Sequence, residues 1–344
     1  MIKYLLRTLL LLGLPLTPLL AADLTSAYTA LRQGVHDMKT KSYIFCSAWR
    51  IALIAATLAV SACDVVNDVV DEIADIGNSA DVHYYLSLGT SLSVGVQPNS
   101  SGTLLPTNDG YADQLFDSIK PAFDTPGTQP RELRLNKLGC PGETLEDMAQ
   151  GGSCPYLAGS QLAAAVDFLN DNMGKVHLVT IDMGGNDFRN AGCIGTTVDF
   201  DCIDAVSLQI ASDLAAVLTA LRDAAGPDTL IVGMNYYNPY LASWLEGDAG
   251  QELAVESASA VAVVTSFLET TYATAGIPVA DVAAAFKSDD FTNMAPAPNE
   301  TLPVSVANIC EFTYMCDADP VGPDIHANDA GYALIADTIA ALLP

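Results

Sequence analysis

The chain has 344 residues, half of them hydrophobic, and a formal net charge of −27. This length suffices for one large domain or two smaller ones. The negative charge excludes a nucleic-acid partner, because phosphates would be repelled. Eight cysteines are many for a cytosolic enzyme and favour an oxidising compartment.

Two segments near the N-terminus resemble export signals. Residues 1–37 hold the first signal-like segment and are expected to be a doubtful extension, because translation could start at Met38. Residues 38–63 resemble a lipoprotein-type signal peptide, in which Cys63 follows small residues and is lipidated. The alternative is an ordinary cysteine at the end of a secretory signal. The apolar runs are too short for confident membrane spans.

After an acidic tether over residues 64–82, a globular domain is expected over 83–344. Its apolar or alternating segments predict strands at 83–88, 131–138, 176–183, 229–235 and 277–282. Helical spacing is found over 111–123, 160–172, 202–225, 251–275 and 328–343, and a further helix is expected after the turn at 139–144. This alternation predicts a parallel sheet with helices on both faces, a three-layer α/β/α, doubly wound fold.

The first predicted strand ends at Gly89 and is followed by Thr90 and Ser91. In an open parallel sheet, ligands bind beyond the carboxyl ends of the strands. Ser91 therefore lies where a hydroxyl nucleophile would be useful. Taken alone, such a turn is more often a solvated Ser/Thr turn, so the interpretation depends on the segments downstream.

Two later turns contain groups that could stabilise an oxyanion. Acyl transfer needs neutral donors aimed at the developing charge. Gly142 supplies a backbone N–H and Asn186 a side-chain amide, with the N–H of Ser91 as a third donor. The alternatives are a plain Pro-Gly turn at Gly142 and a helix cap at Asn186 and Asp187, and we expect Asp187 to cap.

A base is needed to take the proton from the serine, and the chain has four histidines. His36 lies in the leader, and His83 and His177 lie at the entry ends of predicted strands. Only His326 lies in a loop, just before the last predicted helix. Elimination therefore favours His326, although a lone loop histidine is usually a surface residue.

Together these segments resemble the GDSL, or SGNH, hydrolase family. The resemblance rests on residues 89–92, Gly142, residues 184–187 and the segment around His326, in that order along the chain. It implies a flavodoxin-like fold with a five-stranded parallel sheet, and ester hydrolysis without a cofactor or metal. By position it makes Ser91 the nucleophile and His326 the base, with Gly142 and Asn186 completing the oxyanion hole.

Two positions depart from the family pattern. The usual aspartate after the first glycine is Thr90 here, which we expect to change packing or the turn and not the chemistry. The family's aspartate three residues before the histidine is Pro323, and the nearest acid is Asp324. Either Asp324 orients the imidazole, or a backbone carbonyl does so and leaves a Ser-His dyad. Asp317 and Asp319 are weaker candidates.

Six cysteines lie beside the proposed active-site loops. We predict three local disulfides from nearness in sequence, although six cysteines allow 15 pairings. The pairs are Cys140 with Cys154, Cys193 with Cys202, and Cys310 with Cys316. A metal site is disfavoured, because no C-x-x-C or H-x-x-H spacing is present. This layout also resembles the secreted lipases and esterases of the family.

The resulting hypothesis is an exported esterase or lipase, secreted or lipid-anchored at a bacterial cell envelope, monomeric, and acting on an ester or lipid substrate. A membrane contact is expected only through the anchor. The rival hypothesis is a non-catalytic surface lipoprotein that uses the fold as a binding module. A third hypothesis is an enzyme that cleaves a different bond, in a phospholipid or at the acetyl groups of a polysaccharide. Leu92, Val94, Leu104 and Leu105 are candidates for an acyl pocket, or for core.

Overall fold

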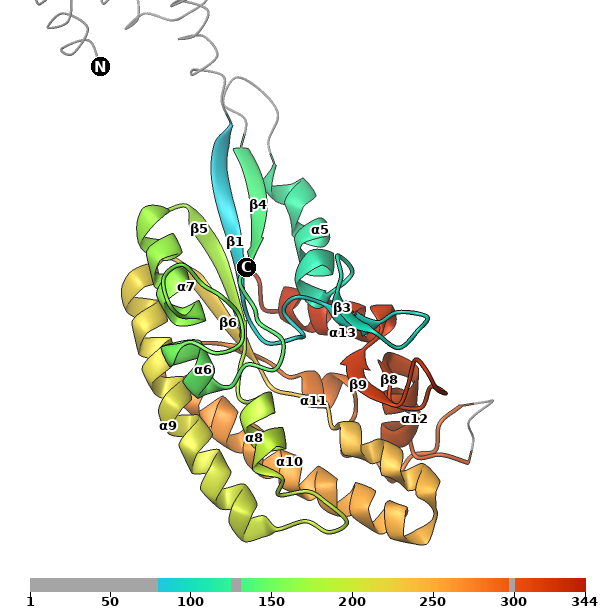
Figure 1. Cartoon of the computed structure of the whole chain (residues 1–344). Helices are drawn as coiled ribbons and strands as arrows, with labels where there is room; N and C mark the ends of the chain where they lie inside the picture. Colours follow the sequence, from blue (N-terminus) through green and yellow to red (C-terminus); the bar gives the residue numbers. More distant parts are fainter. Residues whose placement is uncertain (1–79, 125–130, 297–300) are drawn as a thin grey trace, which may run out of the picture. The chain divides into compact units, whose positions relative to one another are not determined.

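A parallel sheet with helices on both sides forms the centre of the domain (Figure 1). Its five strands are β1 (Asp81–Gly89), β4 (Arg131–Lys137), β5 (Val176–Asp182), β6 (Leu230–Met234) and β7 (Val279–Ala280), in the order β4-β1-β5-β6-β7. All neighbouring strands are parallel. The chain therefore winds outwards in both directions from β1, which confirms the doubly wound, flavodoxin-like prediction.

The computed structural model describes residues 80–124, 131–296 and 301–344. The predicted signal segments, the lipidation site at Cys63 and most of the expected tether lie outside these residues. β1 begins at Asp81, inside the range expected for the tether. The fold below is that of the unit Ala80–Pro344.

Alternate residues of the strands point into two separate hydrophobic cores, one on each face of the sheet. In β1, Leu86 and Leu88 enter the first core, whereas Tyr85 enters the second. In β5, Ile181 enters the first core and Leu178 the second. Because both faces are covered, the inner strands such as β5 are apolar on both sides and appear in the sequence as nearly continuous apolar runs, whereas the edge strand β4 alternates.

Each face has its own set of helices. The first core is closed by α6 (Leu145–Gln150), α7 (Gln161–Asp171), α8 (Gly185–Ala191), α9 (Phe200–Ala225) and α10 (Asp248–Thr274). The second is closed by α5 (Tyr111–Phe123), α11 (Val282–Ala285), α12 (Val304–Phe312), α13 (Asp329–Ala340) and the 3-10 helix η1 (Pro239–Glu246). The helices α9 and α10 are long and apolar enough to cross a membrane by length and composition alone, but both pack into the first core.

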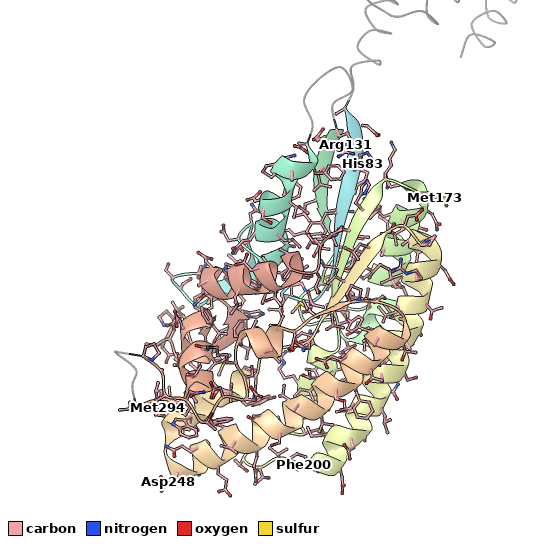
Figure 2. The ribbon with its side chains drawn as sticks, turned by 180° about the vertical axis from the view of Figure 1, so that it is seen from behind. His83, Arg131, Met173, Phe200, Asp248 and Met294 are labelled. Atoms are coloured by element: carbon pink, nitrogen blue, oxygen red, sulfur yellow. A yellow bond between two sulfur atoms is a disulfide. The ribbon has the colours of Figure 1, made fainter. Side chains whose placement is uncertain are left out.

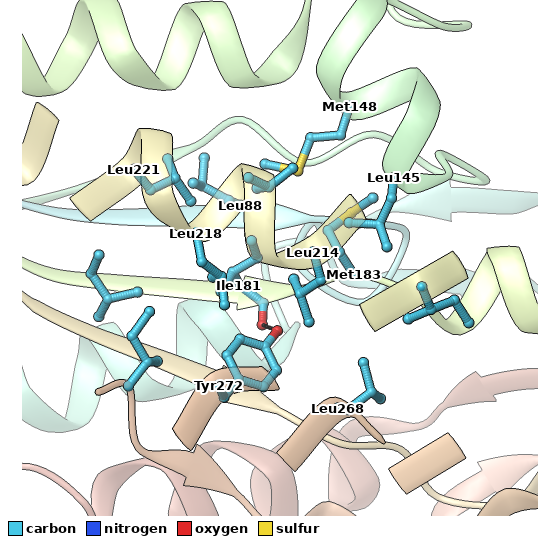
Figure 3. Close-up of a cluster of buried hydrophobic side chains, with 14 of the residues drawn as sticks. Leu88, Leu145, Met148, Ile181, Met183, Leu214, Leu218, Leu221, Leu268 and Tyr272 are labelled. Carbon is cyan, nitrogen blue, oxygen red and sulfur yellow. Dashed lines mark hydrogen bonds between the residues drawn. The ribbon is translucent and has the colours of Figure 1, made fainter. Parts of the chain in front are cut away.

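The first core is built around contacts between strand and helix side chains (Figure 3). Leu88 and Ile181 of the sheet lie against Leu214 and Leu218 of α9. Tyr272 of α10 packs beside Gly233 of β6, where a Cβ would lie 2.3 Å from the tyrosine ring. Glycine at this position therefore makes room for the ring.

Several short elements were not expected from the sequence. These are the hairpin of β2 (Val96–Pro98) and β3 (Leu104–Pro106), the pair β8 (Thr313–Tyr314) and β9 (Asp324–Ala327), and α8, α11, α12 and η1. The hairpin falls in a segment expected to be a loop. Elements this short contain too few residues to show a periodicity.

Candidate active site

The turn that carries Ser91 begins where β1 ends. Gly89 has φ +133°, and a Cβ at this position would lie 2.5 Å from the Cγ of Asp182. Both the conformation and the close approach therefore require glycine. Ser91 is half-buried, and its carbonyl accepts a hydrogen bond from Val96 N at 2.9 Å. The nucleophile candidate is thus held at the carboxyl end of β1, an inner strand of the sheet.

A buried carboxylate from the neighbouring strand supports this turn. Asp182, the last residue of β5, is fully buried. Its Oδ1 accepts hydrogen bonds from Thr90 N at 2.8 Å and Thr90 Oγ1 at 2.7 Å, and its Oδ2 accepts one from Tyr111 OH at 2.9 Å. Burial raises the pKa of Asp182 to about 7, although these donors favour the ionised form. Thr90 therefore serves as a hydrogen-bond donor that ties the turn to β5.

Asn186 and the Gly142 turn are joined by a direct hydrogen bond. Asn186 is the second residue of α8, and its Nδ2 donates to the carbonyl of Glu143 at 3.0 Å. The same turn is fixed to β1, because Cys140 N donates to Gly89 O at 2.9 Å. Gly142 lies between these two anchors with φ +80°.

Asp324 and His326 lie side by side on β9. Asp324 Oδ1 is 2.7 Å from Nδ1 of His326 and also accepts the backbone N–H of His326 at 3.0 Å. In a strand, residues two apart point to the same face, so a D-x-H segment brings the carboxylate to the ring. Burial alone would raise the pKa of Asp324, but the hydrogen bond and charge of His326 hold it below its ordinary value.

Ser91, Asn186 and His326 line one cavity, together with Thr90 and Leu92. Much of the remaining wall is apolar or aromatic and comes from α8, the segment after β6, and α10. Its apolar and aromatic members include Phe188, Tyr236, Tyr240, Val261, Val264 and Leu268. Gly142 is not a lining residue in the described part of the chain.

The four leucine and valine residues expected to line an acyl pocket or to belong to the core have different outcomes, and the core alternative holds for the two buried ones, Leu92 and Val94. Leu92 lines the cavity, but Val94 is buried, and Leu104 and Leu105 are exposed on the β2–β3 hairpin. Proximity in sequence to Ser91 failed here, because the hairpin turns these residues away from the cavity wall.

The other described histidines lie at the opposite end of the sheet. His83 and His177 are on the amino-terminal halves of β1 and β5, and His177 Nε2 is 2.7 Å from His83 Nδ1. Figure 2 shows His83 at one end of the sheet, and Phe200 and Asp248, the first residues of α9 and α10, at the other. His83 and His177 therefore lie away from Ser91, as the argument by elimination for His326 expected.

All three predicted disulfides are present. They join Cys140 to Cys154, Cys193 to Cys202, and Cys310 to Cys316. Asp187 was expected to cap the helix at its own turn, but Gly184 is the N-cap of α8 and Asp187 lies inside that helix. Its carboxylate instead accepts a hydrogen bond from the N–H of Leu145, the first residue of α6. Among the described residues, no group of three or more His, Cys, Asp or Glu side chains is placed to hold a metal ion.

A buried polar network behind the site was missed by sequence reasoning. Gln161 bonds both the N–H and the carbonyl of Gly89, at 2.7 and 2.9 Å, and also donates to the carboxyl of Glu143. Glu143 is 2% exposed, and burial raises its pKa to about 7. The network links the nucleophile turn to the Gly142 turn, but it joins residues that show no common motif.

The sequence model of the GDSL-like lipase/acylhydrolase family matches residues 87–334. The chain belongs to this family. The match spans every candidate site residue from Ser91 to His326, and within the domain it leaves out residues 81–86 of β1 and the end of α13. Membership supports a hydrolase that acts on esters.

Solved structures of two lipases and a phospholipase match this chain. The extracellular lipase from Streptomyces rimosus is 17% identical, with TM-score 0.51, over 76% of this chain and 100% of that one. The lipase Lip_vut3 from a goat rumen metagenome is 16% identical, with TM-score 0.47, over 75% and 96%. Phospholipase A1 from Streptomyces albidoflavus is 19% identical, with TM-score 0.42, over 66% and 94%. The first likeness shows a shared fold. No curated protein matches the chain.

Proposed function

We propose that this GDSL-family hydrolase cleaves carboxylic esters through an acyl-enzyme on Ser91. The observation that carries the proposal is the Asp324–His326 pair at 2.7 Å, in which His326 lines the same cavity as Ser91. With Nδ1 engaged by Asp324, the Nε2 of His326 is the nitrogen left for proton transfer. A carboxylate on the far nitrogen orients the ring and stabilises the imidazolium that forms.

In the proposed reaction, the Oγ of Ser91 attacks the acyl carbonyl while His326 takes its proton. His326 then returns that proton to the leaving alcohol, and a water molecule releases the acyl group by the same route. Asp324 remains ionised throughout, in keeping with its lowered pKa. Pro323 stands where the family usually has the aspartate, but β9 is extended, so Asp324 contacts the imidazole of His326 from two residues away.

The oxyanion is assigned to the N–H groups of Ser91 and Gly142 and the amide of Asn186. In the described part of the chain, the N–H groups of Ser91 and Gly142 have no hydrogen-bond partner. Asn186 uses one amide hydrogen on Glu143 O and keeps the other. Three neutral donors with unengaged hydrogens are what an oxyanion needs.

The test is hydrolysis of a p-nitrophenyl ester series by the oxidised protein and its Ser91→Ala variant. Loss of activity with the serine, at unchanged circular dichroism, is the expected result, and the chain-length profile separates esterase from lipase. Hydrolysis by Ser91→Ala at the wild-type rate would refute the nucleophile assignment. Inactivity of both proteins on every ester would favour the binding-module alternative.

We also propose that the protein is exported, monomeric and anchored through a lipidated Cys63. Three disulfides in the described domain are compatible with an oxidising compartment. Mass spectrometry of the exported protein tests the anchor: an N-terminus at Cys63 without added lipid mass would contradict it.

A further inference from the structure

Arg189 stands out among the residues that line the cavity. It is exposed, and the lining contains no lysine, aspartate or glutamate among the described residues. Arg189 lies three residues after Asn186 on α8, so the two side chains share a face of the helix. A permanent positive charge is thereby placed at the wall of a mostly apolar cavity, beside a candidate oxyanion donor.

The charge of Arg189 helps to lower the pKa of Asp324, but within the described residues Arg189 forms no salt bridge with a carboxylate, although the chain is strongly acidic. Four cations of the described domain, Lys120, Arg134, Lys137 and Lys175, each pair with a carboxylate, and Arg222 donates to two backbone carbonyls. Arg189 forms no such pair within the described residues. Its one hydrogen bond is a long contact of 3.4 Å from Nη2 to Asn186 Oδ1. A guanidinium has five N–H donors, so most of them are left for a ligand.

We propose that Arg189 binds an anionic group of the ester substrate, a carboxylate or a phosphodiester close to the scissile bond. The inference rests on the proposed ester hydrolysis and adds a substrate class to it. A guanidinium recognises both anions through paired N–H donors. Because the protein's net charge of −27 repels anions in general, a local cation is needed for such a substrate to be held.

Two simpler roles for Arg189 make a different prediction. A basic residue in the last turn of α8 is favourable to the helix dipole, and the contact with Asn186 could orient the amide. Either role would affect neutral and anionic esters alike. Discrimination between two substrates that differ only in charge is therefore the decisive readout.

The experiment compares an acid with its methyl ester in two chromogenic pairs. In the first pair the anion is on the acyl end, as in mono-p-nitrophenyl adipate and its methyl ester. In the second pair it is on the leaving group, as in hexanoyloxy-nitrobenzoate and its methyl ester. The measured quantity is the ratio of kcat/KM for the anionic member to that for the neutral member.

We expect Arg189→Gln to lower this ratio about tenfold in at least one pair, because an exposed charge-assisted contact is partly screened by solvent. Arg189→Lys should give an intermediate ratio, since it keeps the charge but not the paired donors. Arg134→Gln, which removes an equal charge from a residue paired with Glu132, is the matched control and should leave the ratio unchanged. Inhibition by a dialkyl phosphate, compared with a carboxylate of similar length, distinguishes the two anions.

Equal ratios in wild type and Arg189→Gln for both pairs would overturn the inference while leaving ester hydrolysis intact. If the wild-type protein hydrolysed neither member of either pair, the proposed function would fail and this inference with it.

Discussion

The buried carboxylate of Asp182 offers a quantitative test of how the nucleophile turn is held. Replacing it with alanine leaves three donors without their acceptor at a fully buried site: the N–H of Thr90, the hydroxyl of Thr90 and the hydroxyl of Tyr111. Each unpaired buried donor costs about 1–3 kcal/mol, so we expect Asp182→Ala to lose about 3–9 kcal/mol of unfolding free energy. Asp182→Asn keeps an acceptor oxygen for Thr90 and should lose less.

The same residue predicts a dependence of stability on pH. Burial raises the pKa of Asp182 from 3.8 to about 7, so between these values the folded state binds more protons than the unfolded state. Stability that is present below about pH 4 is therefore lost as the pH rises through about 7. At about 1.4 kcal/mol for each pKa unit, the loss is up to about 4 kcal/mol.

Urea unfolding of the wild type and Asp182→Asn, from about pH 4 to about pH 8, measures this directly. Asparagine does not titrate, so the wild-type advantage over Asp182→Asn should shrink as the pH rises. Glu143, whose pKa is also raised by burial, titrates in both proteins and cancels in the difference. A difference that stays constant with pH, or an alanine variant as stable as the asparagine variant, would refute the reasoning.

Two further predictions concern β9 and its neighbours. Asp324→Asn should lower kcat about 10²–10⁴-fold with a much smaller change in KM, because the imidazolium of His326 loses its carboxylate partner. Steady-state kinetics on a p-nitrophenyl ester test this prediction. An unchanged kcat would favour a Ser-His dyad. The Cys310→Ser, Cys316→Ser double variant should lose about 2 kcal/mol of unfolding free energy, since the disulfide closes a loop with a sequence separation of 6. Urea unfolding of the double variant, with the oxidised and the reduced wild-type proteins for comparison, measures this loss of unfolding free energy. A urea midpoint of the double variant equal to that of the oxidised wild type would contradict the prediction.

The parallel sheet and the nearness of Ser91, Asn186 and His326 to one another could be predicted because each depends on short stretches of sequence. An apolar run such as Val176–Asp182 is recognised as a strand from its composition. Because the carboxyl ends of parallel strands meet at one edge of the sheet, Ser91 and Asn186 are then expected to lie close together, and both line one cavity. His326 could be chosen as the candidate base by elimination, since His83 and His177 lie at the amino-terminal end of the sheet.

What could not be predicted depends on contacts across long separations. Gln161 reaches Gly89 from 72 positions away, and Asp182 reaches Thr90 from 92 positions away. Neither residue carries a local signal, because a buried polar side chain is recognised only by its partners. The role of Asp324 was left open for a related reason: whether it can reach His326 depends on an extended backbone, and β9 is extended through pairing with the two-residue β8.

The three disulfides also bear on how the protein matures. They join cysteines separated by 14, 9 and 6 positions, so each closes a local loop and none ties together distant parts of the chain. No disulfide spans the sheet, so the topology of the sheet does not depend on oxidation. We therefore expect the reduced chain to form its layered core, and oxidation to act on the local loops that the disulfides close.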